Sequence, residues 1–281
     1  MLPAATVSAH PTDIGELLQY WRKTRQLSQL ALATEAEVSP RHICFLETGR
    51  ARPSRDMVLL LASVLDVPLR ERNALLLSAG FAPMYSEASL DAPELSSVRV
   101  ALEAILRQQE PFPAVVMNRS WDIVRTNRAA DRFFGLLLDD RPASGPANVL
   151  RMMFDPDRLR PYVANWDAVA EALVQRVQRE AVGGVKDAAT VKLLDEILAY
   201  PGVPSRLRTP NLGAPLVPVI PVRFHKRGQT FGFFSTVTTL GTPQDITLQE
   251  LRIECFFPAD DATRLHAERL AAPPGSRDPD D

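Results

Sequence analysis

Cysteine is scarce in this chain of 281 residues, which contains only Cys44 and Cys255. The two lie far apart, and neither belongs to a Cys-x-x-Cys or Cys/His pattern of the kind that binds zinc. Disulfide frameworks and zinc domains are therefore not expected. The composition favours a reduced protein of the cytoplasm.

Long apolar runs are missing as well. Runs such as Val58–Leu61 are far shorter than the about 20 apolar residues that a transmembrane helix needs. The first residues, MLPAATVSAHP, contain neither the basic segment nor the apolar segment of a secretion signal. We therefore expect neither a membrane span nor export.

The sequence also lacks the common motifs of catalysis and cofactor binding. It has no Gly-rich phosphate loop, no Gly-x-Ser-x-Gly, no His-Glu-x-x-His and no His/carboxylate cluster with ligand spacing. Glu254 and the pair Asp260 and Asp261 are the only suggestive acids near the last predicted strand, and a solvated strand face and a helix cap explain them more simply. We expect no enzyme, no metal site and no cofactor.

Charge of one sign is not in excess either. The 32 Lys and Arg residues nearly balance the 34 Asp and Glu residues, so the formal net charge is −2 and the isoelectric point is near 6.1. This balance does not by itself indicate a nucleic-acid binder. DNA binding would have to come from a local basic patch.

The sequence does contain two regions of different pattern, as its length and its 46% hydrophobic content allow. In the first region, five short amphipathic helix patterns follow one another, with Ser28, Ser39 and Ser54 as N-cap residues. We predict an all-α five-helix domain in residues 1–82, followed by a linker in residues 83–97.

The second region combines helix and strand patterns. The segment PAVVMNRSWDIVRTN predicts two strands around a tight turn, and the last third of the chain alternates with a period of two, which predicts three antiparallel strands. Helical stripes lie between these strands. We predict an α+β domain with an antiparallel sheet in residues 98–271 and a flexible tail in residues 272–281.

Strand alternation also predicts which side chains face the interior. The predicted apolar concave side of the sheet is formed by two sets, Phe231, Phe233, Ser235 and Val237 on one strand and Ile253, Cys255 and Phe257 on another. His225 shares strand parity with Arg223 and is expected to face solvent, which argues against a role as a haem ligand.

The helix pattern after Ser39 has two distinct faces. Ile43 and Leu46 lie on one side of the helix, whereas Arg41 and Phe45 lie on the opposite side. A short helix held through its apolar side can present its outer face to the major groove of DNA, which is wide enough for one helix.

The predicted DNA contacts follow from this arrangement. Arg41 is expected to read a base, and Arg50 or Arg52, beyond the helix, to contact phosphates. A simple solvated face would also carry such arginines. The full predicted set is Gln29, Ser39, Arg41, His42, Phe45, Arg50, Arg52 and Arg55.

The run LSQLALATEAEVSPRHICFLETGRARPS resembles the helix-turn-helix of lambda-repressor/Cro-like (XRE) regulators. Its sequel, ARPSRDMVLLLASVLDVPLRERNALLLSAGFAP, is similar to the narrower MmyB-like group, whose members couple that domain to a PAS-like ligand-binding domain. The segment PFPAVVMNRSWDIVRTNRAADRFF resembles the PAS-like entry strands and helix. One departure is Glu37, where the family's turn usually has glycine, so we expect a strained left-handed backbone there.

The resemblance implies a transcription regulator that binds a near-palindromic DNA operator as a homodimer, because one short recognition helix reads only a few base pairs. It also implies a small lipophilic, fatty-acid-like ligand. The predicted ligand-binding residues are Trp121, Phe133, Met153, Trp166, Phe231 and Phe233. Since pockets and cores use the same residue types, the second domain could instead be a dimerisation or protein-interaction module, or less simply an unrecognised enzyme.

Overall fold

The computed structural model describes residues 13–139, 147–182, 188–209, 219 and 221–272. The chain divides into two compact units. Unit 1 contains the described residues up to Glu87 together with Gln244–Gln249, and unit 2 contains the remaining described residues. The predicted tail, residues 272–281, lies outside the described residues from position 273 onward.

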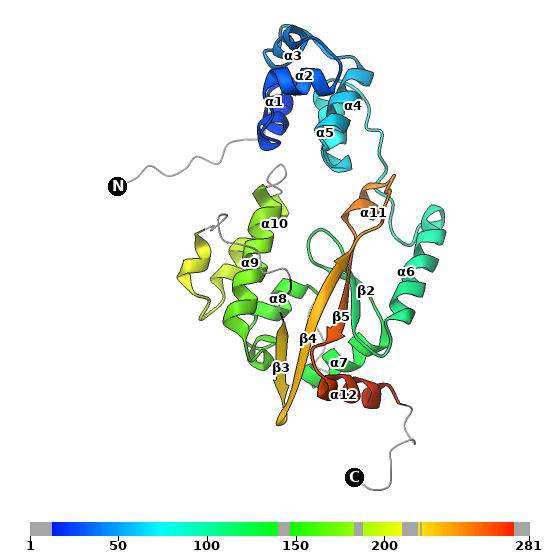
Figure 1. Cartoon of the computed structure of the whole chain (residues 1–281), viewed down its shortest axis with the longest axis vertical. Coiled ribbons are helices and arrows are strands. Elements are labelled where there is room, and N and C mark those ends of the chain that lie inside the picture. The colour runs from blue at the N-terminus through cyan, green and yellow to red at the C-terminus, as the bar shows by residue number, and fades with distance from the viewer. Residues whose placement is uncertain (1–12, 140–146, 183–187, 210–218, 220, 273–281) are drawn as a thin grey trace. The chain divides into compact units, whose positions relative to one another are not determined.

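Unit 1 is helical, as the sequence predicts (Figure 1). Its main helices are α1 (Ile14–Thr24), α2 (Gln29–Glu35), α3 (Pro40–Glu47), α4 (Arg55–Val64) and α5 (Leu69–Ser78). The hydroxyl groups of Ser28, Ser39 and Ser54 each accept a hydrogen bond from a backbone N–H in the first turn of the helix that follows. These caps satisfy donors that a helix start would otherwise leave open, and they confirm the predicted helix starts.

The core of unit 1 depends on a close crossing of α1 and α3. A Cβ atom on Gly15 would lie only 2.7 Å from the carbonyl oxygen of Leu46 and 2.8 Å from that of Glu47. Only glycine allows this approach, because backbone oxygens cannot move aside as a flexible side chain can. Trp21, which is fully buried, fills the space on the inner side of α1.

A segment distant in sequence completes unit 1. Helix α11 (Ile246–Glu250) starts in this segment. Ser86 Oγ donates to Asp245 Oδ2 over 2.6 Å, and the backbone N–H of Leu69 donates to Gln249 Oε1 over 2.7 Å. The second bond satisfies an open donor at the start of α5. Nothing in the local sequence pattern indicates this contribution.

Unit 2 is built on a five-stranded antiparallel sheet with the order β2-β1-β5-β4-β3. The strands are β1 (Ala114–Met117), β2 (Ile123–Thr126), β3 (Val222–Lys226), β4 (Gln229–Thr238) and β5 (Arg252–Pro258). The predicted pair of strands around a tight turn and the predicted three C-terminal strands are therefore confirmed.

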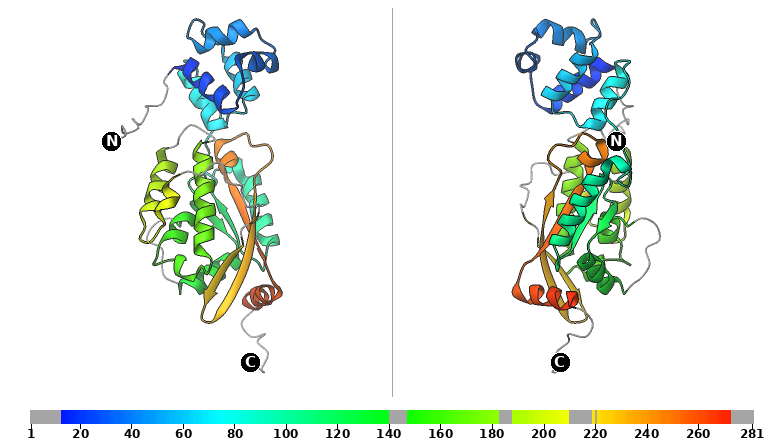
Figure 2. Two further views of the ribbon diagram at one scale, coloured as in Figure 1. Left: turned by 60° about the vertical axis from the view of Figure 1, so that its left-hand side comes forward. Right: turned by 90° about the vertical axis from the view of Figure 1, so that its right-hand side faces the viewer.

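Helices cover the sheet on both sides (Figures 1 and 2). One side carries α6 (Ser96–Gln108), the other carries α8 (Val149–Phe154), α9 (Trp166–Val182) and α10 (Ala188–Ala199), and α7 (Arg128–Leu138) and α12 (Asp261–Ala271) pack near one end. Three short 3-10 turns, Pro93–Leu95, Arg160–Tyr162 and Ser205–Arg208, connect these elements. The aromatic core lies between the sheet and helices α7 to α9.

The strand register corrects one sequence expectation. Ser235 is paired with Phe256, and Glu254 is paired with both Val237 and Val115, so these side chains share one face of the sheet. Since neighbours along a strand alternate between faces, Cys255 points to the opposite face. The expectation that the Phe233 set and the Cys255 set both form the concave side is wrong, because the register between β4 and β5 places them on opposite faces.

Candidate functional site

The outer face of α3 is the first candidate site. Ser39 Oγ accepts from the N–H of His42 over 3.2 Å, and Pro40 occupies the first helical position, which fixes where the helix begins. Ile43 and Leu46 are buried in unit 1. The helix is therefore anchored through its inner side, and Arg41, the predicted base-reading residue, is exposed.

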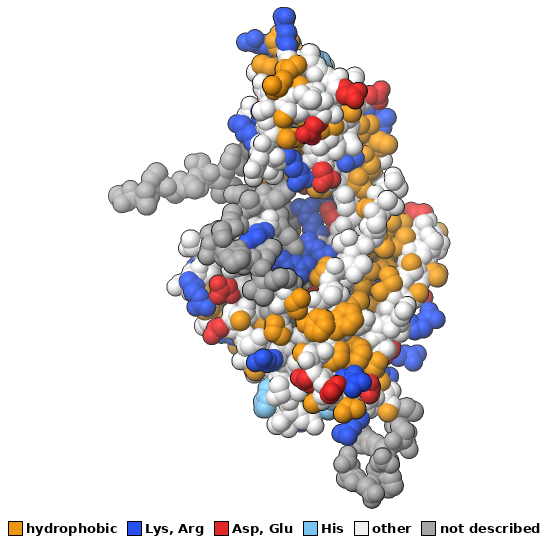
Figure 3. Space-filling model, viewed as in Figure 1, with side chains coloured by type: hydrophobic (Ala, Val, Ile, Leu, Met, Phe, Trp, Pro, Cys, Tyr) orange, Lys and Arg blue, Asp and Glu red, His pale blue; other side chains and the backbone are white. Residues whose placement is uncertain are grey.

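Arginine side chains are held on this face by an aromatic ring. The guanidinium carbon of Arg41 lies 5.0 Å from the ring centre of Phe45, and that of Arg50 lies 5.9 Å from the same ring. Such cation–π contacts restrict flexible side chains without using their N–H donors. Arg52 and Arg55 are exposed nearby in the sequence, and Figure 3 shows basic side chains gathered over α3.

Two of the other predicted DNA contacts, Gln29 and Ser39, already have side-chain hydrogen bonds inside the domain. The carboxamide nitrogen of Gln29 donates to Glu47 Oε2 over 2.9 Å, and the side chain is half-buried. Ser39 caps α3 through its hydroxyl group, and His42 is also half-buried. Contacts from these three residues to DNA remain predictions.

A buried ion pair supports α3 from below. Arg22 Nε and Nη2 donate to the two carboxylate oxygens of Glu47 over 2.6 and 2.8 Å. Burial alone would raise the pKa of Glu47, but the hydrogen bonds from Arg22 and Gln29 outweigh it and hold the pKa below its ordinary value. The pair was not predicted, because its partners are 25 positions apart.

The turn between α2 and α3 contains the predicted strain. Glu37 has a φ of 54°, in the left-handed region that glycine occupies without a penalty. The next N–H, of Val38, donates to the carbonyl oxygen of Ala33 over 2.9 Å, which closes the turn. The expectation for Glu37 is confirmed.

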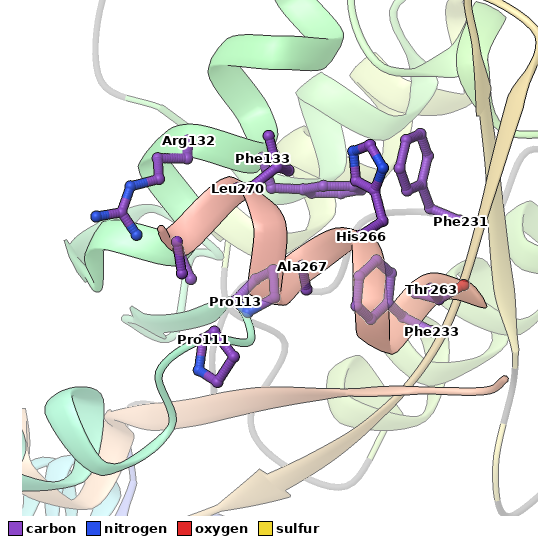
Figure 4. A pocket seen from close by; sticks show the side chains of 12 residues that line it. Pro111, Pro113, Arg132, Phe133, Phe231, Phe233, Thr263, His266, Ala267 and Leu270 are labelled. Atoms are coloured by element: carbon purple, nitrogen blue, oxygen red, sulfur yellow. The ribbon is translucent and has the colours of Figure 1, made fainter. Parts of the chain in front are cut away.

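The second candidate site is an aromatic cluster in unit 2. The ring of Phe133 lies 5.2 Å from Phe224, 5.7 Å from Phe231 and 5.1 Å from Phe233, in edge-on contacts. Phe133, Phe231 and Phe233 line a small cavity beneath α12 (Figure 4). Its volume is about 10 Å³, about the room of one water molecule, whereas a drug-sized ligand needs about 300 Å³ or more.

A histidine lies over this cavity. The ring of His266 on α12 makes an edge contact with Phe231, with ring centres 4.6 Å apart (Figure 4). Burial and the neighbouring Arg269 lower the pKa of His266, which favours the neutral imidazole. Its Nε2 is buried and has no hydrogen-bond partner among the described residues. No sequence pattern singled out His266, because its role depends on packing against β4.

The other predicted ligand-binding residues lie elsewhere in the same core. Trp166 donates its indole N–H to the carbonyl oxygen of Met153 over 2.9 Å, and neither residue lines the cavity beneath α12. Trp121 is buried in the turn before β2, where Arg176 and Arg252 pack against its ring. The six predicted ligand-binding residues therefore lie at three separate places in unit 2 and do not form one site.

Of the acidic residues near the last strand, Asp260 has the predicted environment and Glu254 does not. Asp260 caps α12 by accepting from the N–H of Thr263 over 2.7 Å, as the sequence predicts. Glu254 was assigned to a solvated strand face, and this is wrong, because the register places it on the core face of the sheet. Burial raises the pKa of Glu254, and only tertiary contacts could have identified it.

The described part of the chain contains neither a metal-binding cluster nor a membrane-spanning helix. No three His, Cys, Asp or Glu side chains there are placed to hold a metal ion. None of the helices described is long and apolar enough to cross a membrane. His225 is exposed on β3, as expected from its strand parity.

Models of known protein families match both parts of the chain. A family model described as "MmyB-like transcription regulator ligand binding domain" matches residues 98–270, and one described as "Helix-turn-helix" matches residues 18–72. No curated protein matches the chain. A solved structure titled "Structure of an RNA-binding Light-Oxygen-Voltage Receptor" is 12% identical, with 96% of this chain and 68% of that chain covered, but its TM-score of 0.27 is too low to support a common fold.

Proposed function

Since the chain belongs to the MmyB-like transcription regulators, we propose that α3 reads a DNA operator and that a small lipophilic effector in unit 2 controls this binding. The chain is a DNA-binding transcription regulator with a ligand-binding domain. The proposal assigns DNA binding to residues 1–82, effector binding to residues 98–271, and a linker to residues 83–97.

The observation that supports DNA reading best is the difference between the two sides of α3. Ile43 and Leu46 anchor the helix, whereas Arg41 and Arg50 are stacked on Phe45 outside. A guanidinium held this way keeps its donors for the O6 and N7 atoms of a guanine in the major groove. Arg50, together with Arg52 and Arg55, serves phosphates in this proposal.

We place two copies of the chain on one operator. A recognition helix of eight residues reads only a few base pairs, which is too little to select a site among many competing sequences. Two helices related by a two-fold axis read half-sites about one helical turn apart. The operator is therefore near-palindromic in this proposal.

We place the apolar part of the effector beneath α12, among Phe133, Phe231 and Phe233. Since the cavity is only about 10 Å³, the effector enters by displacing α12 from the sheet. One polar contact between this helix and the sheet is the bond from the N–H of Gly232 to Thr263 Oγ1. A fatty-acid-like molecule suits walls that are almost entirely apolar.

Selection of binding sequences from a random duplex library tests the DNA part. The full chain should enrich an inverted repeat, and a footprint should protect both halves. A control with Arg41→Ala should yield a poorly defined sequence preference. Enrichment of no sequence, or protection of one unpaired half-site by a monomer, would contradict this part.

Thermal unfolding with added saturated fatty acids tests the effector part. Ligand that binds only the folded state stabilises it by about 2.7 kcal/mol at a hundredfold excess over the dissociation constant. Phe233→Ala trims the cavity wall and should change the preferred chain length. Phe154→Ala, an equally buried aromatic position outside the cavity, should lower stability but leave that preference unchanged. If no lipophile shifts the transition, unit 2 is a dimerisation module.

A further inference from the structure

An open groove in unit 2 lies among the end of α8, the start of α9 and the turn after α10. Its volume is about 270 Å³, close to the lower limit of about 300 Å³ that is usual for ligand pockets. Three prolines, one tryptophan and one arginine form its walls, namely Pro156, Pro161, Pro201, Trp166 and Arg160. We name it the Trp166 groove. None of its residues lines the cavity beneath α12, so it is a separate place for a ligand.

Trp166 forms a fixed wall of this groove. Its indole N–H donates to the carbonyl oxygen of Met153 over 2.9 Å, and its ring lies edge-on to the buried Phe154, with ring centres 5.7 Å apart. The side chain is only half-buried, whereas the other two tryptophans of the chain, Trp21 and Trp121, are buried. Trp166 is therefore the tryptophan that a ligand can reach.

The side chain of Arg160 is held against this indole. Its guanidinium carbon lies 4.0 Å from the ring centre of Trp166, and its Nη1 donates to the carbonyl oxygen of Pro201. Gly202 follows with a φ of 71°, and a Cβ atom there would lie 2.8 Å from Arg160 Nη2. Glycine thus leaves the space that the guanidinium occupies. The cation is positioned without a ligand, so little side-chain freedom is lost on binding.

Arg160 keeps donors for another molecule. Its Nη1 has the bond to Pro201, whereas Nε and Nη2 have no hydrogen-bond partner among the described residues, and the guanidinium forms no ion pair with them. A planar guanidinium with two free nitrogens side by side can donate two parallel hydrogen bonds to a carboxylate. The stacking on Trp166 uses the face of the guanidinium and leaves its edge for this purpose.

The neighbouring charges and the walls restrict the kind of anion. Asp155 and Asp157 flank Pro156 in the sequence, and Asp155 Oδ1 accepts from the N–H of Asp157 over 2.8 Å. Two carboxylates near a single guanidinium oppose a ligand with two negative charges more than a ligand with one. Proline rings and an indole offer flat apolar walls, which suit a rigid aromatic ring better than a flexible chain that must be ordered.

We propose that the Trp166 groove binds a small aromatic monocarboxylate. The carboxylate accepts hydrogen bonds from Nε and Nη2 of Arg160, and the aromatic ring lies against Trp166 and the prolines. This site goes beyond the lipophilic site proposed beneath α12 and does not depend on it. The chain then carries two ligand sites of different chemistry in unit 2.

Paired ligands test the role of the carboxylate on the unchanged chain. Calorimetric titration compares 2-naphthoic acid with 2-acetylnaphthalene, which has the same ring and a similar shape but no charge. The acid should bind at least about tenfold more tightly, the effect of one charge-assisted hydrogen bond. Equal affinities, or binding of neither compound, would overturn the inference. Neither result bears on the site beneath α12, which fatty acids test.

Nuclear magnetic resonance locates the bound acid. In a nitrogen–proton correlation spectrum, the acid should shift the indole signal of Trp166, identified by its loss in Trp166→Phe, more than those of the buried Trp21 and Trp121. An acid that binds without moving the Trp166 signal lies elsewhere, and this would overturn the inference.

Replacement of the guanidinium should remove the preference for the acid. Arg160→Met keeps an apolar stem on Trp166 and should weaken acid binding at least about tenfold, with the affinity for 2-acetylnaphthalene unchanged. Arg160→Lys keeps the charge without the planar fork and should restore only part of the loss. Arg223→Met, at an exposed arginine on β3, is the matched control and should change neither affinity. A full preference for the acid in Arg160→Met would overturn the inference. If that variant fails to fold, the two measurements on the unchanged chain still decide.

Discussion

The two units differ in how particular buried polar groups are satisfied. In unit 1, Arg22 and Glu47 satisfy each other through two short hydrogen bonds, and Gln29 completes the network. In unit 2, the buried Trp121 Nε1 and His266 Nε2 have no hydrogen-bond partners among the described residues. A closed network makes a rigid support for an outer face, whereas buried donors and acceptors without partners, such as His266 Nε2 at the small cavity, suit a domain that takes up a guest.

Removing one partner of the Arg22–Glu47 ion pair should strongly lower the free energy of unfolding. Arg22→Ala leaves the Glu47 carboxylate buried and unpaired, and such changes typically cost about 3–5 kcal/mol. Urea unfolding of the full chain, followed by circular dichroism, measures the loss. Lys23→Ala, at the neighbouring exposed position, should change stability by no more than about 0.5 kcal/mol. Equal effects of the two variants would remove the contrast between the units.

The difference in the free energy of unfolding between the wild type and Arg22→Ala should become smaller at acidic pH. Because the folded-state pKa of Glu47 is depressed, its contribution to stability is fully present above the ordinary glutamate pKa of about 4.3 and is lost as the pH falls through the lower folded value. Unfolding curves between neutral and acidic pH measure this. A gap that stays constant or widens in acid would contradict the pairing.

Unit 2 should become more open when α12 is loosened. Thr263→Val keeps the side-chain shape but removes the acceptor for the N–H of Gly232, which leaves a buried donor unsatisfied at a cost of about 1–3 kcal/mol. Hydrogen exchange of α12 and the rate of fatty-acid uptake should both increase. Thr236→Val, at an exposed position on β4, should change neither. Lower stability with unchanged uptake would show that α12 is no entrance.

The smallest effect concerns the turn before α3. Glu37→Gly removes the left-handed strain, which costs an L-residue roughly 1–2 kcal/mol, and should stabilise unit 1 by about 1 kcal/mol after the entropy of glycine is counted. The same replacement at Glu35, within α2, should instead destabilise by up to about 1 kcal/mol. Differential scanning calorimetry distinguishes a gain in stability from a loss. If both replacements lower the stability, the backbone at Glu37 is not strained.

Local features were predictable from the sequence, and tertiary ones were not. Serine caps and apolar spacing act within one helix, so Ser28, Ser39 and Ser54 placed α2, α3 and α4 correctly. The turn residue Glu37 followed from the resemblance for the same reason. The pairing of Arg22 with Glu47 joins two helices, and either residue alone has the pattern of a solvated side chain.

In unit 2 the local features were likewise predictable from the sequence, and more of the tertiary contacts were not. Alternation along single strands predicted the sheet, but it could not fix the register between β4 and β5, so the side on which Glu254 lies was misassigned. Arg176 and Arg252 meet over Trp121 only because α9 and β5 pack together. His266 likewise gains its place from the packing of α12 on Phe231.

In the proposed DNA complex, Arg41 on α3 reads a base. Fluorescence anisotropy at fixed salt should compare the selected operator with a scrambled duplex of the same length. Arg41→Ala should cost about 1–3 kcal/mol on the operator and almost nothing on the scrambled duplex, whereas Arg52→Ala should weaken binding to both. An Arg41→Ala protein that keeps the affinity and selectivity of the wild type would contradict the claim.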